Sequence, residues 1–196
     1  MSLVTTTIGF SDHSGWAVLS VLSGTREDAN LLFRERVQLC PPDLPRQAYH
    51  AVAEQGAAMA VIEQVRQAAL ELARRAIADA NARAGGEVAS AAVAMGRTAV
   101  PDDVTKILAS HTLLHSAEGE LYRELLAEAA AAAGLRVVRF LNKEVRSEAA
   151  AAIGLPLQTL EAKLGEMGKM VGSPWTKDEK DATAAAWLAL ATISSR

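Results

Sequence analysis

One acidic residue, Asp12, lies between two apolar runs near the start of the chain and is the first side chain that could do chemistry. Residues 4–10 and 16–22 are rich in Val, Ile, Leu and Thr, and the Ser, Asp and Gly between them predict a β-hairpin. An Asp at the end of the first strand would face whatever binds there. The alternative is that Asp12 only shapes the turn, through a hydrogen bond from its side chain to the backbone.

Two further groups of polar residues have helical spacing in the second half of the chain. Asp178 and Asp181 are three residues apart, so they share one face of a predicted helix. His111, His115 and Glu118 stand at i, i+4 and i+7 and also share a face, and His with Glu favours manganese or zinc over magnesium. The alternatives are an acidic helix start that complements the helix dipole, and two partly buried histidines without a ligand.

The hydrophobic pattern predicts the elements that hold these residues. After the hairpin, strands are expected at 30–39, 88–95 and 135–141, and helical regions at 46–83, 102–134 and 144–191. The second helical region would be capped by Asp102 or Asp103 and broken near Ser110. Three consecutive strands followed by alternating helices and strands predict an α/β fold with a mixed five-stranded sheet. Its first three strands are antiparallel and the others parallel, with helices on both faces.

Composition narrows the function classes. A chain of 196 residues, half of them hydrophobic, predicts one domain over 1–196. With one cysteine (Cys40), no signal-peptide pattern and no apolar run of membrane-spanning length, we expect a cytoplasmic protein without membrane contact. The net charge of -3 gives no overall attraction to nucleic acid, and phosphate-cradling or dinucleotide-binding glycine motifs are absent from the sequence.

Three short motifs, in their shared order, resemble the ribonuclease H-like fold and, within it, the RuvC-type Holliday junction resolvases. The first is FSDHSGWAV at 10–18, in which an Asp ends the first strand and a Gly precedes the next. The second is SAEG at 116–119, in the helix after the fourth strand. The third is DEKDATA at 178–184, at the start of the last helix. The resemblance spans nearly the whole chain.

The resemblance implies a metal site in which Asp178 and Asp181 join Asp12 around the same ion. Carboxylates of this kind hold Mg²⁺ or Mn²⁺, and two such ions can activate a water and stabilise the leaving oxygen in phosphodiester cleavage. The implied activity is a divalent-metal-dependent endonuclease that hydrolyses structured or branched DNA, and the implied assembly is a homodimer.

The sequence departs from the family pattern at one place. The family has a Glu at the end of the fourth strand, where this chain has AMGR at 94–97, and the charge of Arg97 would oppose a cation there. Glu118 is the expected substitute, with His115 as a further metal ligand, whereas Glu120 and Glu124 are expected to be surface acids.

Two alternatives stay open at this point. A non-catalytic ribonuclease H-like module in a larger assembly would explain the missing strand-end Glu. An actin-like or sugar-kinase-like relative also has an Asp before a Gly and a hairpin, but the chain is short for the usual two domains of that kind.

Overall fold

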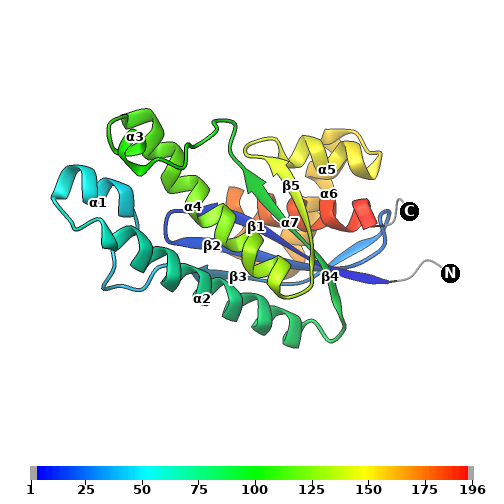
Figure 1. Ribbon diagram of the computed structural model, residues 1–196. Helices are drawn as coiled ribbons and strands as arrows, with labels where there is room; N and C mark the ends of the chain where they lie inside the picture. The colour runs from blue at the N-terminus through cyan, green and yellow to red at the C-terminus, as the bar shows by residue number, and fades with distance from the viewer. Residues whose placement is uncertain (1–3, 194–196) are drawn as a thin grey trace.

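The computed structural model describes residues 4–193, which form an α/β fold around a five-stranded sheet (Figure 1). The strands are β1 (Thr5–His13), β2 (Trp16–Gly24), β3 (Ala29–Gln38), β4 (Val88–Met95) and β5 (Arg136–Leu141). The helices are α1 (Ala48–Gln55), α2 (Ala60–Arg83), α3 (Val104–Leu108), α4 (His111–Ala132), α5 (Val145–Ile153), α6 (Leu157–Val171) and α7 (Lys177–Ile193).

The sheet has the strand order β3-β2-β1-β4-β5. Strand β2 pairs antiparallel with β1 and β3, and β4 pairs parallel with β1 and β5, which confirms the mixed sheet expected from the sequence. Because β1, β4 and β5 run in the same direction, their carboxyl ends meet at one edge of the sheet. Residues that follow these three strands are therefore brought together, however far apart they are in the sequence.

Helices cover both faces of the sheet, and the strands alternate between the two cores. Val93 of β4 packs in the core under α2 and α4, whereas its neighbours Ala92 and Ala94 pack in the core under α5, α6 and α7. Successive side chains of a strand point to opposite faces, so a central strand buried on both sides is apolar throughout. This explains the uninterrupted run of small and apolar residues in β4.

The structure has two helices where the sequence predicted one. The pattern at 46–83 predicts a single long helix, but α1 ends at Gln55 and Gly56 adopts a left-handed conformation with a φ of 72°. Glycine takes this conformation without the steric cost that a Cβ atom imposes, and it commonly ends helices. The break turns α1 away from α2 and lets it lie beside α4. None of the helices within residues 4–193 is long and apolar enough to cross a membrane.

Helix α7 lies against β1 because Gly9 has no side chain. A Cβ atom on Gly9 would come within 2.1 Å of both the carbonyl oxygen of Ala182 and the backbone nitrogen of Ala186. Thr7, two residues earlier on the same strand face, donates a hydrogen bond from Oγ1 to the carbonyl oxygen of Ala186 (2.7 Å). These contacts fix the first turns of α7 beside the carboxyl end of β1.

The contact predicts that Gly9→Ala lowers the free energy of unfolding by more than about 3 kcal/mol, because helix backbone cannot move aside as a flexible side chain can. Urea denaturation followed by circular dichroism measures this loss. The matched control is Gly165→Ala in α6, where a Cβ atom meets nothing within 4 Å. That change should stabilise the protein by about 0.5–1 kcal/mol. Equal stability of the two variants would contradict the role given to Gly9.

Candidate functional site

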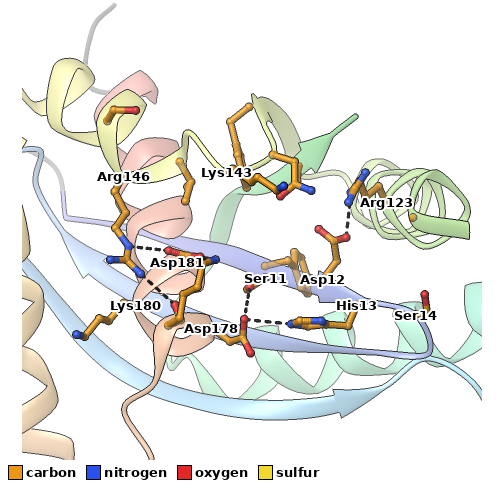
Figure 2. A pocket seen from close by; sticks show the side chains of 18 of the residues that line it. Ser11, Asp12, His13, Ser14, Arg123, Lys143, Arg146, Asp178, Lys180 and Asp181 are labelled. Carbon is orange, nitrogen blue, oxygen red and sulfur yellow. Dashed lines mark hydrogen bonds and ion pairs between the residues drawn. The ribbon is translucent and has the colours of Figure 1, made fainter. Parts of the chain in front are cut away.

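A cavity of about 920 Å³ opens at the edge of the sheet where β1, β4 and β5 end (Figure 2). Asp12 enters it from β1, and Asp178 and Asp181 enter it from the first two turns of α7. Because α7 packs closely against β1, the three aspartates that the sequence analysis predicted to share a site line the same cavity. Asp12 is the second-last residue of β1 and pairs with Ala17 of β2, so it lies within the strand and not in the turn.

The Asp12 carboxylate is held by an arginine. Arg123 of α4 donates from Nε to Asp12 Oδ2 at 2.9 Å, and the two side chains are only 12% and 6% exposed. The same guanidinium donates from Nη1 to Glu120 Oε2 at 3.3 Å. Arg123 thus bridges two carboxylates at the edge of the cavity, which is the place that a cation would take between them.

The side chain of Glu120, a residue of α4, reaches the carboxyl end of β4. Its Oε2 accepts the backbone N–H of Gly96, the residue that follows β4, at 2.9 Å, and its side chain is 21% exposed. The sequence predicted that Glu120 is a surface acid. In the structure it is instead largely buried and bound to the end of β4. It supplies a carboxylate where the family pattern expects a strand-end Glu. Only the three-dimensional structure identifies this role of Glu120. Its carboxylate fits there because Gly96 has no side chain: a Cβ atom on Gly96 would lie 2.7 Å from Glu120 Oε2.

Asp181 is also held by cations. Arg146 of α5 donates from Nε to Asp181 Oδ1 at 2.6 Å, and Lys177 forms an ion pair with Asp181 Oδ2. Arg146 contacts Glu161 as well, at 3.0 Å from Nη1. Burial alone would lower the pKa of the Arg146 guanidinium, but the hydrogen bond that it donates to Glu161 and the charge of Asp181 raise this pKa above its usual value.

Asp178 has milder partners and is the most accessible of the three aspartates. His13 Nε2 lies 3.1 Å from Asp178 Oδ1, and the Ser11 hydroxyl donates to the same oxygen at 3.3 Å. The His13 ring stacks on Trp16 with centroids 4.1 Å apart, which fixes its orientation. Figure 2 shows Asp178 and His13 facing each other across the floor of the cavity.

Basic groups from α4, α5, α7 and the loop before α5 line the cavity. Those near the carboxylates are Arg123, Lys143, Arg146, Lys177 and Lys180. Lys143, between β5 and α5, is exposed and has a φ of 75°, a left-handed conformation that no other non-glycine residue within 4–193 adopts. Such backbone strain often marks positions with a function. Within the same residues, neither Lys143 nor Lys180 forms an ion pair, so both ammonium groups are available to a ligand.

The aspartates fit Mg²⁺ or Mn²⁺ in chemistry but not in arrangement. Hard carboxylate oxygens are the ligands that these ions prefer. However, Asp12 and Asp181 each accept a hydrogen bond from an arginine, and a second positive charge beside those guanidinium groups would be repelled. Among the described residues, only His50, His111 and His115 offer three ligand atoms close enough to share an ion. As arranged here, the aspartates do not form a metal site.

Glu118 and His115 make contacts other than the expected ones. Glu118 lines the cavity but is 2% exposed, and its Oε1 accepts the backbone N–H of His50 at 3.0 Å and lies 3.2 Å from His50 Nδ1. Burial raises the pKa of the Glu118 carboxyl, and the hydrogen bonds from His50 oppose that rise. His115 lies against His50 and His111. Glu118 therefore does not join Asp12 around one ion in this structure.

Two solved structures of Thermus thermophilus RuvC have a fold similar to that of this chain. RuvC in complex with a Holliday junction substrate aligns with a TM-score of 0.52 and 16% identity, covering 94% of this chain and 91% of that one. Another RuvC structure aligns with a TM-score of 0.55 and 13% identity, covering 97% and 96%. The fold is the RuvC fold. No protein-family model matches the chain, and no curated protein matches its sequence. At this identity the likeness establishes the ribonuclease H-like fold expected from the motifs and leaves activity to be argued from the site.

Within this RuvC fold, Arg123 occupies the place of a cation, so Arg123→Gln should have two effects. Without metal, Asp12 loses its charged partner and the free energy of unfolding falls by about 3 kcal/mol, as when a buried ion pair is broken. With millimolar Mg²⁺, which prefers oxygen ligands to imidazole, the variant regains stability by mass action, whereas the wild-type melting temperature does not change. Differential scanning fluorimetry with and without Mg²⁺ measures both effects.

The control for this prediction is Arg97→Gln. Arg97 pairs with Glu144, and both side chains are largely exposed, so its loss should cost less than about 1 kcal/mol and give no response to Mg²⁺. A wild-type protein that is stabilised by Mg²⁺ as much as the Arg123 variant would show that the arginine does not exclude the ion.

Proposed function

We propose that this chain binds structured or branched DNA in the cavity at the carboxyl end of β1, as a cytoplasmic homodimer. The observation that carries the proposal is the state of the cavity: arginines already neutralise Asp12 and Asp181, which leaves Lys143 and Lys180 for phosphate. The RuvC fold supports it, because a RuvC of the same fold has been solved with a Holliday junction substrate.

The charge balance of the cavity favours binding over cleavage. Asp12, Asp181 and Glu120 are each bound to an arginine, so the carboxylates present little free negative charge to an approaching phosphate. Local cations of this kind release counterions from DNA even on a protein whose net charge is negative. This is the non-catalytic module that the sequence left open as an alternative. A four-way junction has two equivalent sides, so a homodimer would place one cavity on each.

Lys143→Gly tests the binding proposal, because glycine removes the charge and also relieves the left-handed backbone. The free energy of unfolding should rise by about 1 kcal/mol. Affinity for a four-way junction should fall about tenfold near 0.1 M salt, with the slope of log K against log [salt] smaller by about 1. Fluorescence anisotropy with a labelled junction gives affinity and the number of chains bound.

Lys163→Ala is the matched control for the DNA experiment. Lys163 is an exposed lysine of α6 that does not line the cavity, so its loss changes the net charge equally and should leave affinity for the junction almost unchanged. If Lys143→Gly is more stable but binds the junction like the wild type, DNA does not occupy this cavity.

A second candidate is the divalent-metal-dependent endonuclease, which would hydrolyse phosphodiester bonds of branched DNA with Mg²⁺ or Mn²⁺. The observation that favours it is the collection of carboxylates at one sheet edge: Asp12, Asp178 and Asp181 in the cavity and Glu120 at the end of β4. For this function, DNA phosphates would have to draw Arg123 and Arg146 away from these oxygens. Glu120, and not Glu118, would then stand in for the strand-end Glu.

Asp12→Asn separates the two candidates in a cleavage assay on a radiolabelled four-way junction with Mg²⁺ or Mn²⁺. A nuclease should cleave the junction, and the variant should lose more than about 100-fold in rate while it still binds the DNA. Asp79→Asn, on the exposed side of α2, is the control that keeps full activity. A binding module should show no cleavage by wild type or variant. Full activity of Asp12→Asn would exclude Asp12 from the reaction.

A further inference from the structure

Three of the four histidines in the chain converge on one side of the cavity. His50 comes from α1, and His111 and His115 come from the first two turns of α4. A ring nitrogen of each lies within 4.8 Å of a ring nitrogen of the other two. Nitrogen ligands of a tetrahedral Zn²⁺, with bonds of about 2.1 Å, lie roughly 3.4 Å apart, so side-chain rotations alone can close the group around an ion.

His50 presents a buried nitrogen that has no partner. Its side chain is 6% exposed, and within residues 4–193 no group hydrogen-bonds to Nε2. Leaving a buried polar atom unpaired is costly, which points to a ligand that completes the site. The neighbouring rings offer no fixed donor, since His111 and His115 are exposed and free to turn.

Glu118 sets the chemical form of His50. Its Oε1 accepts the backbone N–H of His50 and lies 3.2 Å from Nδ1, and we therefore assign the ring proton to Nδ1, from which it is donated to the same oxygen. The lone pair is then on Nε2, the nitrogen without a partner. A carboxylate that orients a metal-binding histidine through its other ring nitrogen is a general feature of zinc sites. Through Oε1, Glu118 is thus a positioning residue, while its Oε2 is buried without a partner within residues 4–193.

We propose that His50, His111 and His115 bind one Zn²⁺ ion, with a water molecule as the fourth ligand. Three imidazoles are a ligand set typical of zinc, and hard ions such as Mg²⁺ prefer oxygen. His111 and His115 are exposed, so solvent reaches the ion, and His115 also lines the cavity of Asp12. The ion joins α1 to α4 beside the DNA-binding cavity. The site goes beyond the proposed function and does not depend on it.

Isothermal titration calorimetry of the metal-free full-length protein with ZnCl₂ tests the site. We expect one Zn²⁺ per chain and a higher melting temperature in the presence of the ion. His111→Ala and His115→Ala remove exposed side chains that the fold does not need, and each should weaken Zn²⁺ binding by more than about 100-fold. Glu118→Gln should weaken it by about 10- to 100-fold and keep the stoichiometry of one.

His13→Ala is the control, because His13 is the remaining histidine and lies with Asp178. It should bind Zn²⁺ like the wild type. Cobalt(II) gives a second readout, since its intense visible bands in tetrahedral sites should appear in the wild type and in His13→Ala but not in His111→Ala. No heat of Zn²⁺ binding to the wild type, or equal binding by His111→Ala and His13→Ala, would overturn the proposal. Because these measurements use no DNA, their result does not depend on whether the protein binds a junction.

Discussion

The approach of α7 to β1 at Gly9 is the contact on which the site depends. Helix backbone atoms occupy the space where a Cβ atom would lie, so no other residue type fits without moving the helix. Because α7 is held this close, its first turn reaches the carboxyl end of β1, and two of its aspartates share a cavity with the aspartate of that strand. The small residues of α7 are thus as necessary to the site as its charged ones.

Bringing carboxylates together creates an electrostatic problem, which proteins solve with metal ions or with basic side chains. In this chain, the guanidinium of Arg123 lies between Asp12 and Glu120, and that of Arg146 lies between Asp181 and Glu161. A tethered cation costs less ordering than a free ion but cannot polarise a water molecule as a metal does. Carboxylates that arginine already neutralises are poorly arranged to hold a catalytic metal ion, and this is why the proposed function is binding and not cleavage.

Local patterns predicted the elements well, since strand alternation, helical spacing and glycine or proline breaks are properties of neighbouring residues. The break at Gly56 was missed because the alanines around it continue the helical pattern on both sides. The partners in the site were harder to predict. Glu118 and Glu120 are two residues apart on α4, so they point to nearly opposite sides, and the rotation of the helix decides which one faces β4. His50 was missed because it is 68 residues from Glu118 in sequence.

Helix α4 therefore contributes one face to the cavity and another face to the histidine cluster. Glu120 and Arg123 face the ends of β4 and β1, whereas His115 and Glu118 face α1. A rigid helix cannot rotate one side without rotating the other, so an ion bound between α1 and α4 would also fix the position of Arg123 relative to Asp12. The histidine cluster and the cavity therefore share one rigid element, although their ligands differ in chemistry.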